Sequence, residues 1–239
     1  MKRVSFPKIA AILLAALGLA TEPGPVFSQN PNPKGLTPEQ VAAIHGRIVQ
    51  SEEPGAIPGR LAKATGDIYI HAPYMIIDEV QLDTKNHLAG WMRDCDLVAI
   101  GKMGTGTPYM TARKGFVNTD WSFVVEEVLK DNTKASVIPG STITVITFGG
   151  NLKIGQRTVH AIQKTYGEFR AGDQYLLFLK FVPETGAYST RWPMGFAFSG
   201  QRAALLAKQP LNRADIEAMD RDALVTTMKQ ALVHPYSRN

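Results

Sequence analysis

From Asp96 onward, short apolar runs alternate with turn residues, and no segment between them has the pattern of a connecting helix. The five runs are 97–103, 121–129, 143–148, 158–162 and 175–182. Parallel strands need crossover connections of about a dozen residues or more, which are usually helical. The spacing therefore predicts an antiparallel meander or a small barrel rather than a βαβ sheet.

Two of the runs indicate how the strands are covered. Residues 142–145 alternate threonine with isoleucine and valine, as in a strand with one buried face. Residues 175–181 read YLLFLKF, which is typical of a strand covered on both faces. The glycine-containing segments 104–106 and 149–151 are predicted to form turns between strands.

The N-terminal residues have the features of an export signal. Basic residues precede an apolar run, 9–19, of 11 residues, which suits a signal peptide and is too short for a bilayer core of about 30 Å. Cleavage is expected after Ala20 or after Ser28, and we favour the second. An uncleaved membrane anchor is the alternative. The chain is accordingly expected outside the cytoplasm, either periplasmic or secreted.

The charge of the mature chain gives little support to a polyanionic partner. Without 1–28 the chain keeps 23 Lys and Arg against 20 Asp and Glu, so the formal charge falls from +5 to +3. No run of four basic residues occurs, whereas nucleic-acid binding needs clustered Lys and Arg. We expect a mixed solvated surface, no nucleic-acid partner, and no stable membrane insertion after cleavage.

Helices are predicted before the strand-rich region. After a linker, Thr37 can cap a helix in which Pro38 takes the first position and Gln40 completes a capping box. This helix should end before the Gly/Pro-rich segment 54–66, which is predicted to be a loop. The β-branched and aromatic segment 67–82 is predicted to be extended.

Two further helices are predicted. Asp83 can cap a short helix that runs through Trp91 and Met92. Near the C-terminus, Asn212 and Asp215 resemble a helix cap, and Pro235 ends the segment. The apolar residues between them follow helical spacing and are Ile216, Met219, Leu224, Met228 and Leu232.

Four segments resemble a pattern found in many bacterial secreted proteins of unknown function. They are DLVAIGKM (96–103), WSFVVEEVLKD (121–131), STITVITFGG (141–150) and AGDQYLLFLKF (171–181). The pattern is similar to an OB-fold-like barrel related in shape to netrin-type modules and to the tissue inhibitors of metalloproteinases. Its motifs are turn glycines and core positions, so the resemblance implies a fold and hardly any function.

The resemblance does not extend to metalloprotease inhibition. Those inhibitors chelate zinc through an N-terminal cysteine held by disulfides, whereas the one cysteine here is the internal Cys95. Asp94 and Asp96 flank it, and neighbouring carboxylates raise a thiol pKa. We expect a half-buried residue at a strand start, although an odd cysteine in an exported chain also permits an intermolecular disulfide.

Searches for catalytic motifs find none. The five histidines form no H-E-x-x-H pair, and there is no G-x-S-x-G elbow or phosphate-binding loop. A site could assemble in the fold from His71, His87 and Asp78, but ordinary surface or core histidines are favoured. We therefore expect no metal and no cofactor.

Aromatic side chains are the candidates for a binding site. They could form a platform on the barrel face, together with the loops around 104–115 and 149–157. The apolar segment 192–196 would be a binding patch if exposed and a barrel closure if buried. The candidate binding residues are Trp91, Tyr109, Trp121, Trp192 and Phe196.

The sequence thus predicts an α+β fold, a small antiparallel OB-like β-barrel with flanking N- and C-terminal helices. Its function is predicted as an exported, non-enzymatic binding or interaction module for an extracytoplasmic protein or an oligomeric ligand. The alternatives are an enzyme whose site assembles only in the fold and a structural envelope protein. The segments are a signal peptide (1–28), a linker (29–36), a helical and extended region packed on the barrel (37–93), the barrel (94–200) and a C-terminal helical region (201–239).

Overall fold

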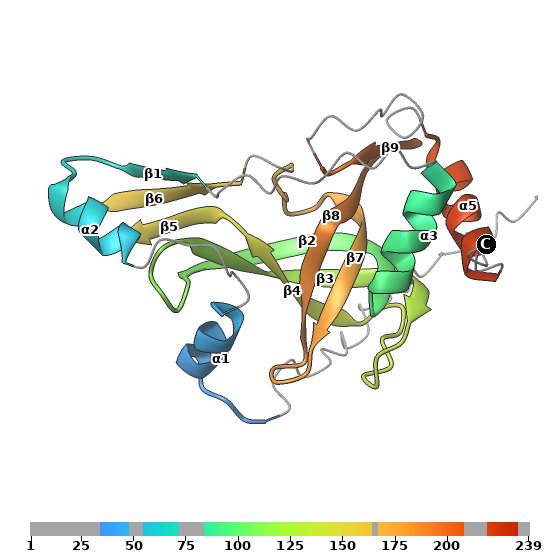
Figure 1. Ribbon diagram of the computed structural model, residues 1–239, viewed down its shortest axis with the longest axis horizontal. Helices are drawn as coiled ribbons and strands as arrows, with labels where there is room; N and C mark the ends of the chain where they lie inside the picture. Colours follow the sequence, from blue (N-terminus) through green and yellow to red (C-terminus); the bar gives the residue numbers. More distant parts are fainter. Residues whose placement is uncertain (1–33, 48–54, 72–83, 164–166, 208–218, 234–239) are drawn as a thin grey trace, which may run out of the picture.

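The chain folds into an α+β structure built on a large mixed sheet (Figure 1). The computed structural model describes residues 34–47, 55–71, 84–163, 167–207 and 219–233. The large sheet has the strand order β4-β3-β2-β7-β8-β9, and β4 also pairs with β8, which makes the sheet ring-like. Its strands are β2 (Leu97–Met110), β3 (Val117–Asp131), β4 (Thr142–Phe148), β7 (Gln174–Val182), β8 (Ala187–Ser199) and β9 (Arg202–Leu205).

The prediction of a purely antiparallel sheet is wrong, because β4 and β8 run parallel. The reason is the even number of antiparallel pairings that lead from β4 to β8. Around the ring β4-β3-β2-β7-β8 there are four antiparallel steps, so the fifth strand points the same way as the first. Two residue pairs make the closure, Val145 with Tyr188 and Ile146 with Ser189, so the ring closes unevenly.

A second, three-stranded sheet extends from one end of the ring (Figure 1). It has the order β1-β6-β5, with β1 (Ile68–His71), β6 (Arg157–Ile162) and β5 (Gly150–Ile154). Strands β5 and β6 form an antiparallel hairpin, and β1 pairs with β6 in parallel. The predicted run 158–162 is therefore a strand, but it lies in this small sheet and not in the ring.

The described residues include four helices: α1 (Pro38–His45), α2 (Ala56–Lys63), α3 (Thr84–Asp94) and α5 (Arg221–Val233). The capping box of α1 is confirmed, since Thr37 N donates to Gln40 Oε1 (2.8 Å) and Gln40 N donates to Thr37 Oγ1 (3.3 Å). None of the helices described is long and apolar enough to cross a membrane.

The loop predicted for 54–66 is wrong, since most of it forms α2. Pro58 lies in the first turn, where the backbone N–H it lacks would have no intrahelical partner. The turn predicted for 104–106 is also wrong, because β2 continues to Met110 and pairs with β3 on both sides of an irregularity between Met103 and Gly106. Likewise Gly150 and Asn151, predicted as a turn, begin β5.

Three apolar clusters hold the fold together. The first fills the ring, with Phe123 and Tyr175 among its fully buried side chains. The second joins the outer face of β2 and β7 to α3 and α5, where Leu88 and Met228 are buried. The third packs α2 on the small sheet through Ile57.

The C-terminal helix begins later than the sequence suggested. Asp220 caps α5, because the backbone N–H groups of Asp222 and Ala223 both donate to its Oδ1. Met219 therefore precedes α5, while Leu224 and Met228 are buried on it. The predicted cap residues Asn212 and Asp215, with Ile216, lie outside the described residues, as does Asp83 before α3.

Candidate functional site

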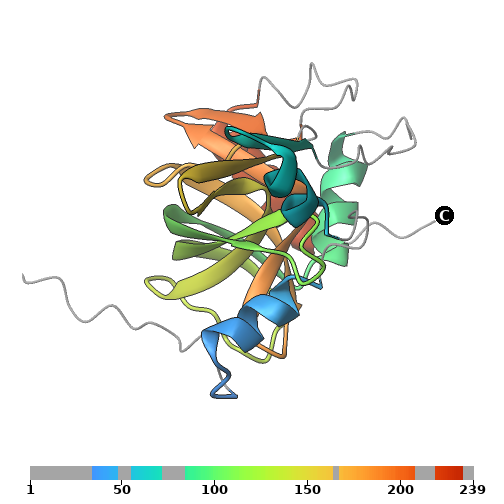
Figure 2. The ribbon, with the colours of Figure 1, turned by 90° about the vertical axis from the view of Figure 1, so that its left-hand side faces the viewer.

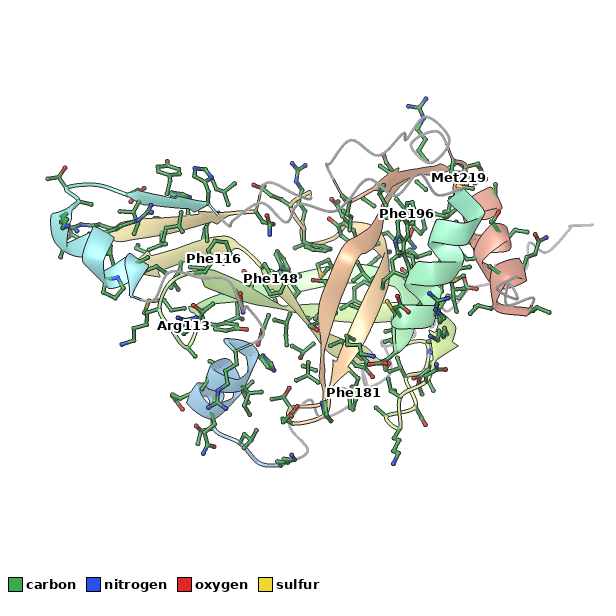
Figure 3. All side chains as sticks on the ribbon, in the orientation of Figure 1. Arg113, Phe116, Phe148, Phe181, Phe196 and Met219 are labelled. Carbon is green, nitrogen blue, oxygen red and sulfur yellow. The ribbon has the colours of Figure 1, made fainter. Side chains whose placement is uncertain are left out.

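A cleft of about 380 Å³ lies where the small sheet meets the ring. Strands β2, β3 and β4 contribute one side of it, the small sheet contributes the other, and residues 167–169 complete the lining. Figure 3 labels Phe148, one of the lining residues, between the two sheets. The volume suits a small molecule or one segment of an oligomer.

The ring side of the cleft is held by a chain of hydrogen bonds. Trp121 Nε1 donates to Thr147 Oγ1 (3.0 Å), Thr147 Oγ1 donates to Thr119 O (3.4 Å), and Thr119 Oγ1 donates to Gly149 O (2.7 Å). A Cβ atom on Gly150 would lie 2.2 Å from Thr119 Oγ1, so a glycine is required there. This side is therefore fixed before any ligand arrives.

The opposite side carries a stacked aromatic pair. Tyr69 and His160 are cross-strand partners on β1 and β6, and their ring centroids lie 4.7 Å apart at an interplanar angle of 13°. Tyr69 is 56% exposed, a large value for an aromatic residue. The stack therefore presents a rigid, flat and solvent-accessible ring face.

Polar groups of the small sheet hold His160 in place. Its Nδ1 lies 2.9 Å from Asn151 Oδ1, and its Nε2 lies 3.6 Å from Asp67 Oδ2. Asp67 also accepts a hydrogen bond from Thr158 N (2.7 Å). These contacts orient the imidazole against the Tyr69 ring.

The structure does not bring the five predicted aromatic residues together. Trp121 lines the cleft. Trp91 lies on α3 and packs edge-on against Phe178 at a centroid distance of 5.9 Å. Phe196 is 0% exposed and belongs to the same helix-covered cluster (Figure 3). Trp192 lies in β8, and its side chain is outside the described residues.

Tyr109, the fifth of these residues, takes part in a separate buried network. Its hydroxyl donates to Asp120 Oδ1 (2.9 Å), while Asp120 Oδ2 lies 2.8 Å from His45 Nδ1. The Nε2 atom of the same imidazole lies 2.8 Å from Thr185 Oγ1. Burial, reinforced by the Asp120 carboxylate, raises the pKa of Tyr109.

The order carboxylate, imidazole, hydroxyl resembles a hydrolase triad, but its burial argues against catalysis. A carboxylate only accepts hydrogen bonds, so Nδ1 of His45 donates to Asp120, while Nε2 bonds to the Thr185 hydroxyl. His45 is 1% exposed and Thr185 is 0% exposed, so a substrate cannot reach the hydroxyl. Asn118 Nδ2 also donates to His45 O (3.3 Å). The network fastens the end of α1 to the ring.

Cys95 is more buried than the sequence indicated, at 4% exposed. Burial raises the pKa of its thiol to about 11, and the flanking carboxylates of Asp94 and Asp96 add smaller contributions in the same direction. Nearby, Lys130 Nζ donates to Met92 O (2.5 Å) and Cys95 O (2.5 Å) at the end of α3. The thiol therefore has a structural position, and the lysine satisfies the last helix carbonyls.

The Cys95 pKa predicts a loss of stability at alkaline pH. The unfolded thiol ionises near pH 9 and the folded thiol near 11, so the stabilisation is complete below 9 and is lost as pH rises through 11. The expected loss is about 2 kcal/mol of unfolding free energy. Urea unfolding of wild type and Cys95→Ala, below pH 9 and close to 11, measures it. Equal pH dependence in the two proteins would contradict this assignment.

The described residues contain no group of three His, Cys, Asp or Glu side chains arranged to hold a metal ion. The hypothetical site from His71, His87 and Asp78 is not assembled from described side chains, since those of His87 and Asp78 lie outside them.

The fold and the cleft define a class, a mostly-β protein with a ring-like sheet and a preformed cleft beside it. No protein-family model and no curated protein sequence matches the chain. The functional argument therefore depends on the geometry. Sequence reasoning missed Tyr69 and His160 as site residues, although both lie in segments predicted to be extended, 67–82 and 158–162.

Proposed function

We propose that this chain is an exported binding module without catalytic activity, and that its ligand binds in the cleft between the ring and the small sheet. The observation that carries the proposal is the exposed Tyr69–His160 stack facing a hydrogen-bonded side built around Trp121. Export rests on the basic and apolar pattern of residues 1–28.

The strand order supports an OB-like reading of the ring. In chain order the five ring strands are β2, β3, β4, β7 and β8. Each of them pairs with two others, and of the five pairings four are antiparallel and one is parallel. OB folds bind oligonucleotides and oligosaccharides across their second and third strands. The corresponding strands here are β3 and β4, which place Thr119, Trp121 and Thr147 in the cleft.

The lining favours one segment of an oligosaccharide as the ligand. Flat aromatic faces cover the apolar side of a sugar ring, while hydroxyl, amide and carboxylate groups bind its hydroxyl groups. Tyr69 and Trp121 supply the faces, and Asn151 and Glu168 supply polar groups around the same cleft. Its size holds a part of such a polymer and not the whole of it.

Replacing Tyr69 by alanine should weaken ligand binding about tenfold without unfolding the protein, because a stacking face is lost from a residue that is largely exposed. The measurement is binding to a glycan array prepared from cell-envelope oligosaccharides, followed by Trp fluorescence titration with each hit. Ile138→Ala is the matched control, since Ile138 is equally exposed (57%) and does not line the cleft. Equal binding by both variants would place the ligand elsewhere.

An enzyme is the second candidate, because His45, Asp120 and Thr185 have the order of a triad. It requires a state in which Thr185, 0% exposed here, meets a substrate. The module proposal needs no such rearrangement, since the cleft is already open.

A further inference from the structure

Basic residues gather at the end of the molecule formed by α2, the β5–β6 turn and the connection from β2 to β3. In Figure 2 this end faces the viewer. Six of the side chains are exposed and Arg157 is half-buried. We call this surface the basic end, and it consists of Arg47, Arg60, Lys63, Arg113, Lys114, Lys153 and Arg157.

Backbone contacts bring these distant parts of the chain together. Gly55 N donates to Arg113 O (2.8 Å) and Ile57 N donates to Lys114 O (3.1 Å), which ties α2 to the β2–β3 connection. Arg157 Nη1 donates to Leu61 O (2.5 Å), which ties α2 to the small sheet. Figure 3 shows Arg113 close to Phe116 and below the small sheet.

Arg47 joins the same surface through the end of α1. A Cβ atom on Gly46 would lie 2.4 Å from Ala112 N, so the residue before Arg47 packs directly against the residue before Arg113. Four segments that are far apart in the sequence therefore contribute charge to one end of the fold.

The positive charge of the basic end is left uncompensated among the described residues. Three lysines elsewhere form ion pairs with carboxylates: Lys102 with Glu126, Lys180 with Asp96, and Lys229 with Glu127. None of the described ion pairs includes a residue of the basic end.

Acidic residues near the basic end are few. Asp67 is engaged by Thr158 N and faces His160, and Asp120 is bonded to His45, two residues before Arg47. Glu52 and Glu53 precede α2 in the sequence and lie outside the described residues. With all four counted, seven basic residues still exceed four acidic ones.

We propose that the basic end docks the protein on a bilayer surface rich in anionic phospholipid. Lys and Arg near such a surface attract lipid phosphate additively and need no shaped pocket. A single-stranded nucleic acid is disfavoured, because such binding uses successive aromatic rings along a basic groove; among the described residues here Phe116 is buried, and the exposed ring nearby is Tyr69 of the cleft. The proposal is independent of the cleft and its ligand.

Vesicle sedimentation tests the proposal. The chain should bind vesicles of phosphatidylglycerol mixed with phosphatidylcholine and should leave pure phosphatidylcholine vesicles in solution, with binding that weakens as salt rises. The triple variant Lys63→Gln, Lys114→Gln, Lys153→Gln should bind on the order of 100-fold more weakly, because each basic residue contributes about fivefold. These lysines are exposed, so folding should be unchanged.

The matched control removes the same charge elsewhere. Lys102→Gln, Lys134→Gln, Lys229→Gln should keep most of the affinity, since these residues lie outside the basic end. An equal loss of vesicle affinity in both triple variants would show that only the net charge of the protein matters, and it would overturn the proposal. Equal binding to neutral vesicles, or a loss seen with duplex DNA and not with vesicles, would overturn it as well. Tyr69→Ala should leave vesicle binding unchanged, which separates this result from that of the cleft.

Discussion

Gly195→Ala is expected to destabilise the protein by about 4 kcal/mol or more, enough to prevent folding in many domains of this size. Gly195 has φ +143 in β8, a backbone conformation that residues with side chains rarely adopt. A Cβ atom there would lie 1.8 Å from Leu176 O, and 3.0 Å from Leu177 Cα, on the paired strand β7. Neither atom can move away without breaking the ring. Soluble yield and the urea midpoint measure the effect.

Gly200→Ala is the control for this substitution. Gly200 also has a positive φ, +58, but nothing lies within 4 Å of the Cβ position. Its replacement should cost only about 1 kcal/mol, the strain of a left-handed alanine. Similar midpoints for the two variants would show that β7 and β8 do not approach as closely as the ring requires.

The same part of the sheet explains why the fold was only partly predictable. Four of the five apolar runs are ring strands, and the fifth, 158–162, is a strand of the small sheet. The missing ring strand, β8, contains Pro193 and Gly195, residues that normally argue against a strand interior. Local preference therefore excluded a strand that tertiary pairing with β7 and β4 imposes.

The sequence predicted an aromatic binding surface, but most of the residues that line the cleft could not be predicted from it. Trp121, one of the aromatic candidates, lies within a clearly predicted strand and lines the cleft. The stack of Tyr69 on His160 depends on β1 pairing with β6 across about 90 residues of chain, which no local pattern reveals. The burial of Phe196 likewise depends on tertiary packing, because α3 and α5 cover its face of the sheet.

The basic end could not be predicted from the charge pattern of the sequence either. The sequence contains no basic run, and its net charge is small once 1–28 is set aside. The fold nonetheless collects cations from short segments around Arg60, Arg113 and Arg157, while three lysines elsewhere are paired with carboxylates. A surface patch is a property of the folded chain, so composition alone underestimates it.

The second large effect is expected at the junction between α1 and the ring. His45→Ala should lower the free energy of unfolding by about 3 kcal/mol, because it leaves the fully buried Thr185 hydroxyl and one Asp120 oxygen without their partner. Asp120→Ala should have a similar cost, since Tyr109 OH also loses its acceptor. Urea unfolding of the purified variants measures both.

The double variant decides what the network does. If it is a structural fastening, His45→Ala and Asp120→Ala together should cost about 1–3 kcal/mol less than the sum of the single costs. The exposed pair Lys102 and Glu126, 3.6 Å apart, provides the reference cycle, with a coupling below about 1 kcal/mol.

Thr185→Val distinguishes fastening from catalysis, because it keeps the shape of the side chain and removes only the hydroxyl. If the network is structural, this variant should lose about 1–2 kcal/mol of unfolding free energy, because the imidazole Nε2 loses its partner. A nucleophile would instead lose turnover while stability stayed unchanged. Since Thr185 and His45 are buried where the end of α1 meets the ring, we expect the first result. A cost near zero for His45→Ala would contradict the structural role and favour the enzyme.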